Sequence, residues 1–305
     1  MVTMAKEAPA YFIKLGERGA WESESLDNGI IRFGYSETPH DLCVASDWDQ
    51  VWEIWYGLRE DAGTATRDVS QIRTFYEADK DSVFITFHGG QMYWCHPGGP
   101  VEMMDNHSHR MRRTLDGWHR TSIGGKSLEV SSLSGHLTRV QMFRGTICSV
   151  KAREYLYRKI NDITVEEVQR ADEAEVAYSQ AVIDLMRLLG WKDFELIVDL
   201  VFASSGWRRI SGVGKTQKYV DIVLFMPTTG ERAFVQVKAE TSTREIREYL
   251  KDFNGSAYDR MFMVWHQGNV DTSISAEGVN LIDSESFARM VIDAGLVWWL
   301  KEKVS

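Results

Sequence analysis

Two short stretches decide the fold of the C-terminal part of the chain: Tyr219-Val-Asp-Ile-Val-Leu-Phe225 and Ala233-Phe-Val-Gln-Val-Lys238. Both are rich in β-branched and aromatic residues, which favour strands. The segment between them contains Pro227-Thr-Thr-Gly230, a sequence typical of a turn. The two stretches are therefore predicted to be paired strands.

Three polar side chains in these strands are expected to meet at one place. Gln236 and Lys238 are two residues apart, so they project from the same face of their strand, and Asp221 on the neighbouring strand can point at them. Carboxylate and amide oxygens are the ligands that Mg²⁺ prefers, and an ammonium group can activate water and hold a phosphate. The trio therefore fits metal-assisted hydrolysis of a phosphodiester bond.

The surrounding sequence predicts an αβββαββα order. Residues 192–206 are predicted to be a helix, with Asp193 as its N-cap and Gly206 as its stop, and residues 207–211 a strand. Beyond Lys238 we expect a helix over residues 243–254, strands over 261–265 and 279–283, and a helix over 285–294.

Residues 180–300, with this order of elements, resemble the Mrr-like branch of the PD-(D/E)xK restriction endonuclease superfamily. The motif of that branch is a helical Glu, then an Asp, then Gln-x-Lys. The resemblance makes Glu195 the helical acid, Asp221 the metal-binding Asp, and Gln236 and Lys238 the final pair. It implies a restriction-endonuclease-like core, in which helices flank a mixed central sheet.

The expected cofactor is Mg²⁺, with Mn²⁺ able to substitute. Asp221, the Gln236 oxygen and the Val237 carbonyl would hold the metal, and Glu195 would bind it directly or through water. Lys238 would orient or deprotonate the attacking water. In the alternative interpretation, these residues form an ordinary polar face of a sheet. Val235 and Val237, which flank Gln236, argue against it because they indicate a central strand, where a Lys needs a partner.

Residues 211–217, ahead of Asp221, contain Gly214-Lys215-Thr216, which invites a nucleotide-binding interpretation. A P-loop needs a further Gly five positions before the first of these residues, and Arg209 occupies that position. No ATP is therefore expected. The family often has glycines around its Asp, whereas Lys218-Tyr-Val precedes Asp221 here.

Composition predicts a cytoplasmic globular protein. The 305 residues are 44% hydrophobic and contain three widely spaced cysteines without a C-x-x-C pair. We expect no membrane association, because no apolar run approaches the ~20 residues of a membrane-spanning helix and the N-terminus lacks the apolar core of a signal peptide.

The formal net charge of −9 argues against indiscriminate nucleic-acid binding, but basic residues are concentrated locally. Residues 110–159 contain 11 Lys and Arg against 3 Asp and Glu. A second basic cluster precedes Asp221 and is expected to contact the DNA backbone. It comprises Arg208, Arg209, Lys215 and Lys218. Solvated surface charge is the alternative for both clusters.

Residues 1–160 are predicted to form a separate domain, a curved β-sheet or barrel with attached helices. Strands are expected at residues 11–15, 30–35, 82–87, 91–95 and 137–143, and helices at residues 47–58 and 69–76. Residues 12–21, a gap, and then residues 29–35 resemble the start of PUA-like folds of the EVE type. That resemblance implies a pocket that accommodates a flipped, modified base.

Such a pocket needs aromatic side chains for stacking and polar groups for the base edge. The candidates are Trp21, Tyr35, Trp94, Trp118 and Lys126, with a role in the core as the alternative for each Trp.

A linker helix is expected over residues 161–190, beginning at the capping-box sequence Thr164-Val-Glu-Glu167, and a nuclease domain over residues 191–305. The overall prediction is an endonuclease that cuts modified double-stranded DNA. An idle nucleic-acid-binding protein and an RNA-directed nuclease are the alternatives. Cutting both strands implies a homodimer, which the apolar residues 296–300 could support unless they pack on their own sheet.

Overall fold

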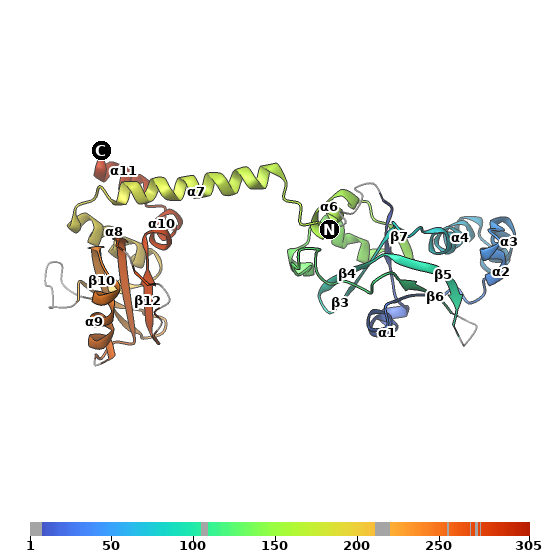
Figure 1. Ribbon diagram of the computed structural model, residues 1–305, viewed down its shortest axis with the longest axis horizontal. Helices are drawn as coiled ribbons and strands as arrows, with labels where there is room; N and C mark the ends of the chain where they lie inside the picture. Colours follow the sequence, from blue (N-terminus) through green and yellow to red (C-terminus); the bar gives the residue numbers. More distant parts are fainter. Residues whose placement is uncertain are drawn as a thin grey trace. The chain divides into compact units, whose positions relative to one another are not determined.

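The computed structural model describes residues 8–104, 109–210, 220–254, 256–268, 270–271, 274 and 276–305. The chain divides into two compact units, Met1–Thr164 and Val165–Ser305. Both combine sheets with helices (Figure 1). In the described residues, no helix combines the length and apolar character needed to cross a membrane.

The described strands of the first unit form two sheets. One has the order β4-β3-β1-β7, in which β1 is parallel to β3 and antiparallel to β7, and β3 and β4 form a hairpin. The other has the antiparallel order β2-β6-β5. The strands are β1 Ala10–Ile13, β2 Ile30–Phe33, β3 Val83–His88, β4 Gln91–Cys95, β5 Pro97–Met103, β6 Arg110–Thr114 and β7 Ile147–Ser149.

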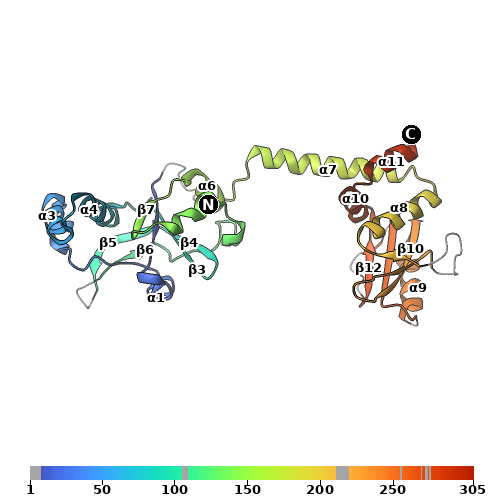
Figure 2. The ribbon, with the colours of Figure 1, turned by 180° about the vertical axis from the view of Figure 1, so that it is seen from behind.

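The two longest helices of this unit begin at short polar side chains that cap them. Asp47 accepts a hydrogen bond from the Gln50 amide at the start of α3, and Asp61 accepts one from the Thr64 amide at the start of α4. The helices are α1 Glu22–Asp27, α2 His40–Val44, α3 Trp48–Arg59, α4 Ala62–Glu77, α5 Gly135–Thr138 and α6 Arg153–Ile160. Figures 1 and 2 show α3 and α4 side by side from opposite directions.

Two expectations for this unit need correction. The described strands form two sheets and not a closed barrel. Residues 137–143 are not a strand, because α5 is followed by a 3₁₀ turn at Arg139–Met142. Leu137, Val140 and Phe143 all pack into the same apolar cluster, and their spacing of three residues suits helical turns and not the two-residue repeat of a strand.

The described part of residues 165–305 forms one mixed sheet with the strand order β12-β11-β10-β9-β8. Neighbouring strands β10, β11 and β12 are parallel, whereas β9 is antiparallel to both β10 and β8. The strand that carries Gln236 and Lys238 is therefore central, as predicted. The strands are β8 Arg208–Arg209, β9 Ile222–Phe225, β10 Arg232–Glu240, β11 Arg260–Gln267 and β12 Val279–Ile282.

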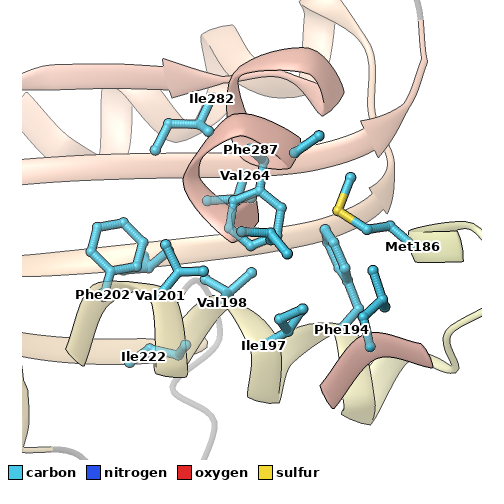
Figure 3. Packing of buried hydrophobic residues seen from close by; sticks show 14 of the residues in the cluster. Met186, Phe194, Ile197, Val198, Val201, Phe202, Ile222, Val264, Ile282 and Phe287 are labelled. Carbon is cyan, nitrogen blue, oxygen red and sulfur yellow. The ribbon is translucent and has the colours of Figure 1, made fainter. Parts of the chain in front are cut away.

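Apolar side chains cover both faces of this sheet. Ala233, Val235 and Val237 face a core built with the helices α7, α8, α10 and α11, whereas Phe234 faces a smaller core built with α9. Figure 3 shows the side chains of α8 opposite those of the strands in the larger core. The helices are α7 Glu166–Met186, α8 Trp191–Ser204, α9 Thr243–Asn254, α10 Ser284–Asp293 and α11 Val297–Val304.

The helix starts of this unit differ from the sequence-based expectation. Helix α7 has Val165 as its N-cap and no side-chain cap bond, so the predicted capping box does not form. Gly190 is the N-cap of α8, because the helix already begins at Trp191, and Asp193 instead pairs with Lys303 at 3.1 Å.

The apolar C-terminal segment packs on its own unit. Val297 and Leu300 of α11 are buried in the larger core, and Figures 1 and 2 show α11 beside α7. Trp298, between them in sequence, remains 71% exposed.

Candidate active site

Asp221 lies directly before β9 and is fixed against the central strand. Its amide donates to the carbonyl of Val235 at 3.3 Å, the same residue that pairs with Ile222 at the start of β9. Its Oδ2 accepts hydrogen bonds from Gln236 Nε2 at 2.5 Å and from the Val237 amide at 2.8 Å. The carboxylate is therefore held beside β10, next to the first residue of β9.

The position of Asp221 makes its charged form costly. Burial is the largest cause that raises the pKa of its carboxyl, and the nearby negative charge of Glu195 raises it further. The Val237 amide, Lys238 and Gln236 act in the opposite direction but do not cancel the effect. A carboxylate in these surroundings is stabilised by a cation.

Two more oxygens of β10 fit a cation at this place. The Gln236 side chain is 5% exposed, and among the described residues its Oε1 atom has no hydrogen-bond partner. Such an orphaned buried oxygen is costly unless something binds it. The Val237 carbonyl must face the same side as its amide, which points at Asp221, because both groups of an extended residue project in one direction.

Lys238 projects from the same face of β10 as Gln236 and approaches α9. Its Nζ lies 5.7 Å from the centre of the Tyr249 ring. Burial alone would lower the pKa of Lys238, but Tyr249, Glu245 and Asp221 outweigh burial and raise it. The ammonium therefore lies near Tyr249 of α9, and the negative charge of Asp221 stabilises it.

Glu195 reaches the site from α8, and its carboxylate is paired with Arg209. Its Oε1 accepts from Arg209 Nη2 at 3.1 Å, and Arg209 Nη1 pairs with Asp199 Oδ2 at 3.3 Å. The structure thus brings Glu195, Asp221, Gln236, Val237 and Lys238 together, and hard oxygen donors of this kind suit Mg²⁺.

The expected DNA-backbone residues are placed differently from one another. Arg208 is exposed on β8. Arg209, its neighbour, has a side chain only 14% exposed and pairs with two carboxylates. Lys215 and Lys218, together with the Gly214-Lys215-Thr216 segment, lie outside the described residues.

The N-terminal unit contains a cavity of about 450 Å³ that includes two of the five predicted pocket residues, Trp21 and Tyr35. The Tyr35 backbone is left-handed, with φ of 62°. Its hydroxyl donates to Asp68 at 3.2 Å, and burial raises the pKa of this phenol, so it remains a neutral donor. The cavity therefore combines aromatic side chains with charged ones, and the Tyr35 hydroxyl is held in place by Asp68.

The other three predicted pocket residues lie elsewhere. Trp94 is 5% exposed, and its indole donates to the Thr121 carbonyl at 2.8 Å. The Trp118 indole donates to the Ile30 carbonyl at 2.9 Å and packs against the core. Lys126 is exposed, 3.8 Å from Asp162. None of the three lines the cavity of Trp21 and Tyr35 in the part of the chain that the structure describes.

Several site residues escaped the prediction from sequence. Asp199 follows Glu195 by four residues on a helix, a spacing that signals a shared face. Tyr249 of α9 and the cavity residues Trp55 and Arg59 gave no comparable signal, because tertiary contacts alone bring them to their sites.

The fold of the C-terminal unit is compatible with a restriction-endonuclease-like core, and its central strand presents an amide and an ammonium beside a carboxylate. The family model described as restriction endonuclease, of the Mrr catalytic type, matches residues 186–291. The C-terminal unit therefore contains an Mrr-like restriction endonuclease domain. A search of curated proteins and a search of solved structures each found no significant match.

Proposed function

We propose that the chain is a metal-dependent DNA endonuclease whose reaction centre is formed by Glu195, Asp221, Gln236, Val237 and Lys238. The observation that carries the proposal is the orphaned Gln236 oxygen beside a buried carboxylate, on the central strand of a restriction endonuclease domain. These groups provide the oxygen ligands that Mg²⁺ or Mn²⁺ would bind.

Each residue has a separate task in this proposal. Asp221, Gln236 Oε1 and the Val237 carbonyl would hold the metal, with Glu195 binding directly or through water. A bound divalent ion would offset the charge of the scissile phosphate and lower the pKa of its water. Lys238 lies on the same face as Gln236 and would orient the attacking water; its raised pKa keeps the side chain protonated, which disfavours the alternative role of deprotonating that water. Arg208, exposed on β8, would contact the DNA backbone.

The test compares Asp221→Ala and Lys238→Ala with Glu231→Ala. Glu231 pairs with Arg260 just before β10, so its variant removes a charge at the opposite end of the same strand. We expect both site variants to lose Mg²⁺-dependent cleavage of DNA while their circular dichroism matches that of the wild type, and Glu231→Ala to keep cleavage. Retained cleavage in both site variants would refute the proposal.

We further propose that the N-terminal unit selects the target and that a modified base is its ligand, as the resemblance to EVE-type folds implies. The cavity of Trp21 and Tyr35 supports this role, since aromatic faces stack on a flipped base and the fixed Tyr35 hydroxyl offers a polar contact. Lys14, Arg18 and Arg144 also line the cavity, and their charges suit the phosphates beside such a base.

A panel of substrates distinguishes this proposal from its rivals. The panel contains RNA, unmodified DNA, and DNA with methylated or hydroxymethylated cytosine. Cleavage confined to modified DNA, and lost in Trp21→Ala, supports the proposal. Cleavage of RNA favours an RNA-directed nuclease, and binding without any cleavage favours an idle nucleic-acid-binding protein.

A further inference from the structure

Arg209 joins two acidic side chains of α8 next to the proposed metal site. One nitrogen of its guanidinium, Nη2, pairs with Glu195, and another, Nη1, pairs with Asp199. Glu195 and Asp199 are one helical turn apart, so both carboxylates face β8 from the same side of the helix. All three side chains are largely buried.

This arrangement fixes the orientation of Glu195. A guanidinium is planar and presents its donors in a rigid fork, so two carboxylates bound to it are set relative to each other. Arg209 uses Oε1 of Glu195, and within the described residues Oε2 of Glu195 has no hydrogen-bond partner. Oε2 belongs to a carboxylate whose charge already acts on Asp221.

The same contacts make Arg209 a poor candidate for gripping phosphate. To reach the DNA backbone, its guanidinium would have to leave two partly buried carboxylates, whose charges would then lack a partner. Arg208 is exposed on the same strand, and among the described residues it has no carboxylate partner.

We propose that Arg209 is a positioning residue of the metal site: anchored by Asp199, it holds Glu195 so that the free carboxylate oxygen is directed to the cation at Asp221. This inference rests on the proposed function, because it assumes the metal site. Partners that orient metal ligands typically change metal affinity about 10–100-fold when they are removed.

The experiment measures Mn²⁺ binding to the full-length chain without DNA, from the electron paramagnetic resonance signal of free Mn²⁺. The variants are Arg209→Met, Arg209→Lys and Asp221→Ala. Arg260→Met is the matched control, because it removes an arginine that pairs with Glu231 at 2.8 Å in the same unit. Circular dichroism and thermal unfolding establish that each variant is folded.

The sign of the effect separates positioning from simple electrostatics. Removing a positive charge near a cation site should tighten binding if charge alone mattered. We instead expect Arg209→Met to weaken Mn²⁺ binding about 10-fold or more, Arg209→Lys to recover part of the loss, and Arg260→Met to bind like the wild type. If Arg209→Met does not fold, Arg209→Lys decides, and wild-type affinity in that variant overturns the inference.

A double-mutant cycle tests the role of Asp199. If Asp199 acts through Arg209, Asp199→Asn should weaken binding in the wild type and add little in the Arg209→Met background. Unchanged or tighter binding in Arg209→Met overturns the inference and leaves the proposed metal site intact. Wild-type protein that binds no Mn²⁺, or that binds it no better than Asp221→Ala, overturns the proposed function itself.

Discussion

Arg110 of β6 holds the loop that presents Tyr35 to the N-terminal cavity, and its removal should destabilise that unit selectively. The side chain is fully buried. Its guanidinium donates to the carbonyls of Gly34 at 3.0 Å, Tyr35 at 2.7 Å and Thr38, and to the Tyr76 hydroxyl at 2.8 Å. Such contacts can hold a left-handed Tyr35 backbone, which by itself costs about 1–3 kcal/mol.

The substitution Arg110→Met keeps the aliphatic volume but removes every donor. Three carbonyls lose a partner, and buried groups without partners cost about 1–3 kcal/mol each, or about 3–9 kcal/mol in sum. Part of this cost is returned because a buried charge no longer has to be desolvated. We expect a net loss of about 2–5 kcal/mol, at the high end of single-residue effects.

Hydrogen exchange followed by mass spectrometry reads the two units of the full-length chain separately. In Arg110→Met, the protection of peptides from residues 8–164 should decrease by about 2–5 kcal/mol. The protection of peptides from residues 165–305 should not change. The control is Arg113→Met on the same strand, where the side chain is exposed. Equal protection in the Arg110 and Arg113 variants would refute this account.

Three further predictions concern the C-terminal unit. Burial lowers the pKa of His266 in the folded protein, so the unfolded chain binds a proton at this side chain more readily. The free energy of unfolding of the unit should therefore decrease as the pH drops below about 6.5. Unfolding measured at two pH values should show a smaller decrease in His266→Leu than in the wild type. A Cβ on Gly268, where φ is 121°, would lie 2.0 Å from the Thr241 carbonyl oxygen, so Gly268→Ala should lower the midpoint of thermal unfolding more than Gly230→Ala, which meets open space. Phe287 is fully buried in the larger core, and Phe287→Ala should cost about 3–5 kcal/mol in hydrogen-exchange protection of this unit; equal protection would contradict this packing.

The core of the C-terminal unit could be predicted from the sequence because its strands carry strong local signals. The alternation in β10 placed Gln236 and Lys238 on one face, and the observed sheet has that strand at its centre. Helix α9 was predicted at residues 243–254, where it is found. Helix ends were less predictable: Gly190 rather than Asp193 caps α8, because a glycine N-cap gives no side-chain signal.

Contacts between distant parts of the chain were not predictable in the same way. The sequence placed Arg209 beside Arg208 in a basic cluster, and only the fold brings it against Glu195 and Asp199. The strand expected at residues 137–143 had an apolar pattern compatible with helical turns as well. Short apolar segments of this kind do not distinguish a strand from a helix.

Positive charge in this chain serves three different purposes, which a count of basic residues cannot separate. In the segment 110–159, Arg110 and Arg112 are buried and donate to backbone carbonyls, so neither is available to neutralise phosphate. Arg209 is bound between two carboxylates, whereas Arg208 is exposed. The positive surface that can meet DNA is therefore smaller than the sequence indicates, and electrostatic attraction alone should contribute correspondingly less to affinity. If the proposed function holds, a chain with a net charge of −9 must therefore choose its target more by shaped contacts, such as those proposed at the cavity of Trp21 and Tyr35, than by electrostatic attraction.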